Sequence, residues 1–89
     1  MSHTSGCQLY LVYLRDAETA LDPSEFDGMR QLDEGLFLTQ SDESRSRIYH
    51  AVKHATGAEQ LLIAPLADDP KFKGMEAGAL KWLRQLDQT

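Results

Sequence analysis

The stretch that most constrains the fold is Q-L-Y-L-V-Y-L, residues 8–14, near the start of the chain. It is short, aromatic and β-branched and contains no glycine or proline, so it predicts a β-strand. Successive side chains of a strand point to opposite faces of its sheet. Both sets of alternate positions are apolar here: Leu9, Leu11 and Tyr13 on one side, and Tyr10, Val12 and Leu14 on the other. We therefore expect a strand that is buried on both faces.

The segment after this strand predicts a connection and then a hairpin. Asp22-Pro23-Ser24-Glu25 resembles a helix start, with a capping acid, a proline in the first turn and a glutamate three residues after the cap. Because Gly28 follows closely, any helix here has about two turns at most. Residues 29–32 either end that short helix or form a second strand. The acids and the glycine of Asp33-Glu34-Gly35 favour a tight turn, and so a hairpin over residues 30–40.

The second half of the chain predicts a helix, a strand and a closing helix. Ser41, Asp42 and Glu43 are typical of a helix N-terminus, and Gly57 is a natural stop. Between them an apolar stripe has helical spacing: Ile48, Ala51, Val52 and Ala55. Residues 60–66 predict the next strand. A second apolar stripe predicts the closing helix: Met75, Ala79, Trp82, Leu83 and Leu86.

These elements predict a small α+β domain. Its mainly antiparallel sheet has helices on one face and a truncated first helix. With 89 residues in all, we expect a flexible lead-in at residues 1–7 and a single domain at residues 8–89. The net charge of −5 argues against a general nucleic-acid binder and against binding to an anionic membrane. The single cysteine, Cys7, cannot form an internal disulfide, and we expect a cytoplasmic protein with no signal peptide or membrane span.

The order of elements is similar to that of the ferredoxin-like sandwich. It resembles the small proteins related to the CRISPR-associated adaptation nuclease family, which dimerise through their sheet. The matching segments are Leu9–Leu14 as the first strand, Arg30–Gln40 as the hairpin, Asp42–Ala55 as the helix, Leu61–Leu66 as the next strand and the closing A-L-K-W-L. Nuclease members of the family carry an aspartate directly after a tyrosine at the end of the first strand. Here Leu14 follows Tyr13, so the nearest acid, Asp16, is the candidate catalytic residue.

Candidate binding residues fall into two groups. Arg47, His50 and His54 share the helix side opposite the apolar stripe. Two histidines four residues apart can reach one zinc ion, but zinc needs further ligands, so we expect no metal and interpret this side as solvated or as a partner surface. The second group, Lys71, Phe72 and Lys73, predicts a site for an anionic ligand or a partner. The alternative is that Phe72 covers the core while both lysines are solvated.

We favour a small dimeric interaction or ligand-binding module without catalysis or cofactor, whose partner is a second copy, another protein or a small anionic ligand. The alternatives are a metal-dependent nuclease and a small enzyme with a cavity between sheet and helices. A deep pocket near Tyr10 or Tyr13 would favour the enzyme. For the dimer we expect a sheet-face interface that uses alternate residues of segments 9–14 and 36–40, helped by Phe72 and Leu80.

Overall fold

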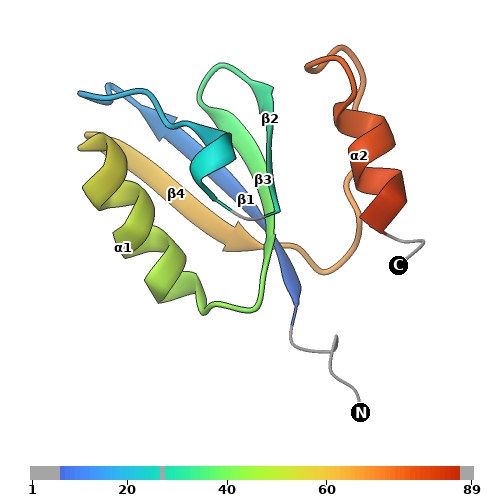
Figure 1. Cartoon of the computed structure of the whole chain (residues 1–89), viewed down its shortest axis with the longest axis horizontal. Coiled ribbons are helices and arrows are strands. Elements are labelled where there is room, and N and C mark those ends of the chain that lie inside the picture. Colours follow the sequence, from blue (N-terminus) through green and yellow to red (C-terminus); the bar gives the residue numbers. More distant parts are fainter. Residues whose placement is uncertain (1–6, 27, 87–89) are drawn as a thin grey trace.

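Strand β1 (Gln8–Arg15) lies inside a four-stranded sheet of order β2-β3-β1-β4, in which all neighbouring strands are antiparallel. The computed structural model describes residues 7–26 and 28–86, so the predicted lead-in lies outside it except for Cys7. The other elements follow in chain order: η2 (Pro23–Glu25), β2 (Met29–Asp33), β3 (Leu36–Ser41), α1 (Arg45–Thr56), β4 (Gln60–Pro65) and α2 (Ala79–Leu86). This is an α+β domain with two helices, as predicted (Figure 1).

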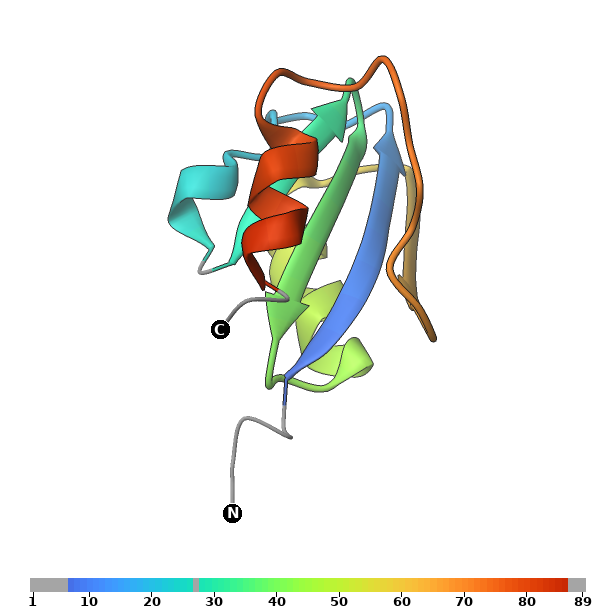
Figure 2. The ribbon, with the colours of Figure 1, turned by 90° about the vertical axis from the view of Figure 1, so that its right-hand side faces the viewer.

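The two helices cover opposite faces of the sheet, so the prediction of helices on one face is wrong. The α1 face holds Tyr10, Val12, Leu14, Ile48, Val52 and their neighbours in one core cluster. The opposite face holds a second cluster of buried residues: Leu32, Leu38, Ala79 and Leu83. Because the central strand is apolar on both sides, both faces need cover. Figure 2 shows how residues 66–78 run along the sheet and over one of its ends before α2 begins.

The first connection contains the predicted capping chemistry but only one 3₁₀ turn, so the first helix is truncated as expected. The Asp22 side chain accepts hydrogen bonds from the Ser24 hydroxyl at 2.7 Å and from the Ser24 backbone N–H at 3.0 Å. These bonds stabilise the carboxylate and hold the pKa of Asp22 below its ordinary value. Leu21 and Phe26 flank the turn and pack on the α1 face of the sheet, which gives the turn its anchor.

The predicted hairpin is confirmed, with its turn at Asp33-Glu34-Gly35. Gly35 has φ 72°, a left-handed conformation that glycine adopts without steric cost. Its carbonyl accepts a hydrogen bond from the Leu14 backbone N–H at 2.9 Å. A Cβ atom at Gly35 would lie 2.5 Å from the Leu14 carbonyl oxygen, so the hairpin tip can approach the central strand only with glycine at this position.

Helix α1 begins at Arg45, later than the predicted start at Ser41 to Glu43. The Ser44 hydroxyl caps it by accepting a hydrogen bond from the Arg47 N–H at 3.2 Å. The Ser41 hydroxyl instead accepts from the Glu43 N–H at 3.0 Å, which forms a local turn ahead of the helix. The predicted start of α1 was too early because several neighbouring residues, including Ser41 and Ser44, have side chains that can cap a helix.

The C-terminal end of α1 was predicted correctly, whereas its buried stripe was only partly right. Gly57, at φ 63°, ends the helix, and its N–H donates to the Lys53 carbonyl at 2.8 Å. The buried residues of the helix are Ile48, Val52 and Thr56. Ala51 is exposed. The buried Thr56 hydroxyl donates to the Val52 carbonyl at 2.8 Å, so this polar side chain is satisfied within the helix.

Helix α2 begins at Ala79, although its predicted apolar stripe starts at Met75. Met75 lies in the segment before the helix and still packs on the second core cluster. None of the helices in the described part of the chain is long and apolar enough to cross a membrane.

Candidate functional site

The sheet face opposite α1 is only partly covered, and it carries a row of large apolar side chains. In the sheet, Tyr13 lies directly between Leu36 of β3 and Leu62 of β4. The next row toward the start of β1 places Leu11 between Leu38 and Ala64. We call the half-covered part of this surface the open face: Leu11, Tyr13, Leu36, Leu62 and Ala64.

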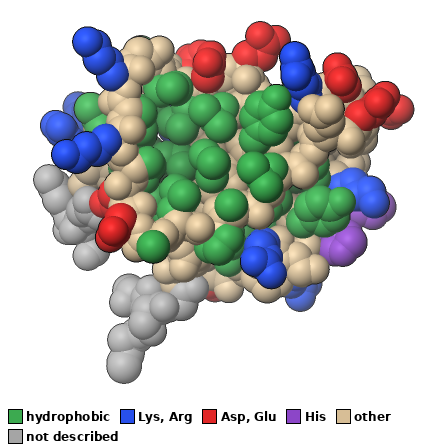
Figure 3. All heavy atoms as spheres, turned by 180° about the vertical axis from the view of Figure 1, so that it is seen from behind, with side chains coloured by type: hydrophobic (Ala, Val, Ile, Leu, Met, Phe, Trp, Pro, Cys, Tyr) green, Lys and Arg blue, Asp and Glu red, His purple; other side chains and the backbone are tan. Residues whose placement is uncertain are grey.

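Exposure on this face increases from β3 toward β4. Leu38 is fully buried beneath α2, and Leu11 beside it is half-buried. Leu36 and Tyr13 are half-buried, whereas Leu62 is 51% exposed and is the most exposed large hydrophobic residue among those described. Figure 3 shows hydrophobic side chains gathered in a broad patch over the sheet, with charged groups around its border. The cover supplied by α2 therefore ends before it reaches β4.

The loop between β4 and α2 places the predicted Lys71, Phe72 and Lys73 group beside this face. Phe72 is half-buried and packs on the second core cluster, together with Leu66 and Met75. Lys71 and Lys73 are exposed. Phe72 thus helps to cover the core, as the alternative interpretation expected, while the lysines on either side of it in the sequence are exposed.

The candidate catalytic residue Asp16 lies in a different place, a surface cleft at the end of β1. The cleft has a volume of about 740 Å³ and is formed by the β1 end, the loop that follows it and the β2–β3 turn. Tyr13, Arg15, Asp16 and Glu34 contribute to its lining. Asp16 is exposed and has φ 57°, a left-handed conformation that is uncommon for residues other than glycine. Its carbonyl accepts the Glu59 N–H at 3.2 Å, which ties this bend to the start of β4.

The predicted group on the helix does not belong to the Asp16 cleft, because it faces solvent on α1. Arg47, His50 and His54 are all exposed. Arg47 Nε lies 3.3 Å from a Glu43 carboxylate oxygen, and this pair is solvent-exposed and so contributes little to stability. His50 and His54 share a shallow hollow of about 330 Å³ with Lys53. Arg47 borders a different hollow, between α1 and η2, although it lies on the same exposed side of the helix as His50, three residues further on.

Metal-ligand geometry is lacking in the described part of the chain. Within residues 7–26 and 28–86, no three or more His, Cys, Asp or Glu side chains are grouped so that they could hold a metal ion.

Leu62 is the residue of the open face that the sequence pattern did not single out. It lies in the continuous apolar run of residues 60–66, and such a run does not reveal which positions are covered. The available signal was its alternation with Leu61 and Ile63, which pack on the α1 face. That alternation becomes informative only when the pairing of β4 with β1 is known.

Comparison with protein-family models, with curated proteins and with solved structures gives no match for this chain. Its function therefore has to be inferred from the geometry and chemistry of these surfaces.

Proposed function

We propose that this protein is a small non-catalytic interaction module that acts as a homodimer, in which the two copies meet at the β4 border of the open face, where Leu62 lies. The observation that carries the proposal is the position of Leu62, 51% exposed at the end of a row with Tyr13 and Leu36. Burial of such a surface against a partner is favourable in proportion to the apolar area removed from water.

A second copy of the chain suits this surface because the five residues of the open face are all apolar. The charge that follows them on the same face of β1, Arg15, lies at the end of the strand opposite Gln60. In a two-fold dimer each patch meets itself, so any charge near the axis would face a like charge. The protein carries a net charge of −5, yet its acids lie outside the five residues of the open face. A stable interface needs about 800 Å² from each partner, roughly an eighth of the 6162 Å² surface of the described protein.

The ferredoxin-like fold and the resemblance to the dimeric CRISPR-associated proteins belong to this proposal. The strand order β2-β3-β1-β4 with antiparallel neighbours supports the fold, and so does α1, which links β3 to β4 across the face of β1. The short η2 turn stands where the first helix of that fold would be. Helix α2, on the opposite face, is an addition to the pattern and covers part of the surface through which a bare sheet would associate.

The experiment replaces Leu62 by lysine and compares its sedimentation with that of Leu80→Lys. Leu80 on α2 is 38% exposed, so it matches Leu62 in residue type and approximate exposure. It lies outside the open face, so this proposal, unlike the expectation from the sequence, leaves Leu80 out of the interface. We expect Leu62→Lys to sediment as a monomer and Leu80→Lys to remain a dimer. If Leu80→Lys dissociates and Leu62→Lys does not, the surface is assigned to the wrong side of the molecule.

A second candidate function, favoured by the cleft at the end of β1, is a small enzyme. The cleft borders Tyr13 as that alternative required, and the left-handed conformation of Asp16 is of the kind that gathers at functional sites. For its nuclease form we expect no cleavage of RNA or DNA with Mg²⁺ or Mn²⁺. Cleavage that is lost in Asp16→Asn but retained in Asp68→Asn, an exposed acid beyond the far end of β4, would make the nuclease the function instead.

A further inference from the structure

One hydrogen bond shows which backbone N–H and C=O groups of β4 point away from β1. The Leu66 N–H donates to the Leu9 carbonyl at 2.9 Å, and these two residues stand directly opposite each other when the β1–β4 register is extended by one pair. Antiparallel pairs alternate between hydrogen-bonded and non-hydrogen-bonded, so alternate β4 residues also direct their backbone toward β1: Gln60, Leu62 and Ala64. Leu61 and Ile63 consequently direct their N–H and C=O groups along the outer edge of the sheet.

The two edges of the sheet are protected very differently. At the β2 edge the Leu32 carbonyl accepts the Glu76 N–H at 2.7 Å, a bulge lies between Gln31 and Asp33, and charged side chains flank the strand. The β4 sequence Q-L-L-I-A-P carries no charge, and its single proline is its last residue. Proteins usually protect an open edge with charges, prolines, bulges or a covering segment. Among the described residues, β4 is the edge without such protection along most of its length.

We infer that β4 pairs antiparallel with β4 of a second copy, across a two-fold axis at Leu62, so that the two four-stranded sheets form one continuous sheet. This inference rests on the proposed homodimer and specifies its edge and its register.

The register follows from the available donors and acceptors. With Leu62 opposite its own copy, Leu61 of each subunit faces Ile63 of the other, and each such pair exchanges both N–H···O bonds. This register uses every outward donor and acceptor of Leu61 and Ile63. An axis at Ile63 would place Leu61 opposite Pro65, which has no N–H and would leave the Leu61 carbonyl unpaired.

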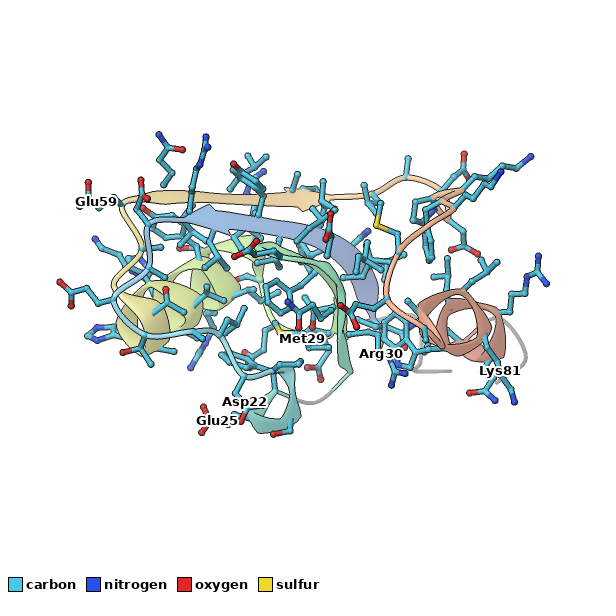
Figure 4. All side chains as sticks on the ribbon, turned by 90° about the horizontal axis from the view of Figure 1, so that it is seen from above. Asp22, Glu25, Met29, Arg30, Glu59 and Lys81 are labelled. Atoms are coloured by element: carbon cyan, nitrogen blue, oxygen red, sulfur yellow. The ribbon has the colours of Figure 1, made fainter. Side chains whose placement is uncertain are left out.

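An axis at Leu61 is also disfavoured, because it requires an outward N–H at Glu59. That N–H already donates to the Asp16 carbonyl within the subunit. Figure 4 shows Glu59 at the start of β4, at one end of the sheet, with Arg30 and Lys81 at the far end near α2. The strand β4 itself carries no charged side chain, and on α1 the Nζ of Lys53 lies 6.0 Å from the centroid of the Tyr49 ring.

The side chains along this seam are complementary on both faces. On the open face Leu62 meets Leu62 of the second copy in a non-hydrogen-bonded pair, where Cβ atoms lie about 4.5–5.5 Å apart. On the α1 face Leu61 meets Ile63. Tyr49, which is 37% exposed, lies on the side of α1 away from the hollow shared with η2, and so on the side of β4. This places a further apolar side chain beside the seam.

The arrangement also bears on the nuclease alternative. Asp16 is held beside Glu59, three residues from the Leu62 axis along β4. At roughly 3.3 Å per residue, two Asp16 residues related by that axis lie on the order of 20 Å apart along the seam. Carboxylates so far apart cannot share a metal ion.

Amide hydrogen exchange of the native protein tests the inference directly. The N–H groups of Leu62 and Ala64 point toward β1 and serve as internal controls. In the paired dimer we expect the Leu61 and Ile63 amides to exchange as slowly as these controls. Fast exchange at Leu61 and Ile63 in a protein that is dimeric would overturn the β4 pairing but leave the proposed dimer standing. A monomer under the same conditions would overturn both.

Disulfide trapping provides a second measurement that does not depend on exchange rates. In a Cys7→Ser background, Leu62→Cys places two thiols together at the axis, and we expect a covalent dimer under mild oxidation. The matched control, Leu80→Cys in the same background, is expected to stay a single chain of about 10.0 kDa. A Leu80→Cys crosslink in the absence of a Leu62→Cys crosslink would place the contact on α2 and reject the seam.

Discussion

Replacement of Leu62 by alanine should weaken the dimer much more than it weakens the fold. Complete burial of a leucine side chain contributes about 1.5–3 kcal/mol, and Leu62 keeps about half of its surface, 51%, exposed in one subunit. Each subunit therefore has roughly 0.8–1.5 kcal/mol to gain by covering it. A symmetric dimer contains two such residues, so the loss is about 1.6–3 kcal/mol, or a rise in the dissociation constant of roughly 15- to 150-fold. The free energy of unfolding of the isolated subunit should fall by no more than about 1 kcal/mol.

Sedimentation equilibrium across a range of concentrations measures this dissociation constant, with Leu80→Ala as the control. We expect Leu80→Ala to leave it within about threefold of the native value, since Leu80 lies on α2 and outside the seam. A Leu62→Ala dissociation constant that is also within about threefold would refute the reasoning. The half-exposed leucine would then remain in water in the dimer.

Other substitutions test the fold and the solvated residues. Gly35→Ala should lower stability by about 2 kcal/mol or more in thermal unfolding, because the new Cβ would lie 2.5 Å from a backbone oxygen at φ 72°; a change below about 0.5 kcal/mol would contradict this. Replacement of His50 and His54 by glutamine should shift Tm by about two degrees at most, and zinc should not raise the Tm of the native protein; a zinc-dependent rise lost in the variant would reverse this interpretation. NMR titration should find the pKa of Asp22 below its ordinary 3.8 and higher in Ser24→Ala. Because folding lowers this pKa, its stabilising effect is present above the ordinary pKa and is lost as the pH falls through the folded value. The backbone N–H bond survives in Ser24→Ala, so an unchanged Asp22 pKa in that variant would rule out the Ser24 hydroxyl bond as the main cause.

Local chemistry made several elements predictable from the sequence. The alternating apolar residues of β1, the acid–proline pair at Asp22, the glycine of the Gly35 turn and the Gly57 stop each depend on neighbours within a few residues. The start of α1 was harder, since Ser41 and Ser44 can both accept a backbone N–H and only the folded chain selects Ser44 as the cap.

The sheet face on which α2 packs is decided by tertiary contacts, and the helical spacing of apolar residues does not reveal it. A strand that is apolar on both sides requires cover on both faces, and either a second helix layer or a second subunit can supply it. The structure uses α2 for the part around Leu32 and Leu38 and leaves the β4 side open. The left-handed conformation of Asp16 was equally hidden, because it accompanies a hydrogen bond to Glu59, a residue more than forty positions further along the chain.

The most direct measurement of the central claim is the mass of the native protein in solution at micromolar concentration, by light scattering after size exclusion or by sedimentation. Association through the open face and the β4 edge predicts a species of twice the 10.0 kDa chain mass, in a concentration-dependent equilibrium with the single chain. A mass of 10.0 kDa that does not change on concentrating the protein would contradict the homodimer, and with it the assignment of the open face as an interaction surface between copies.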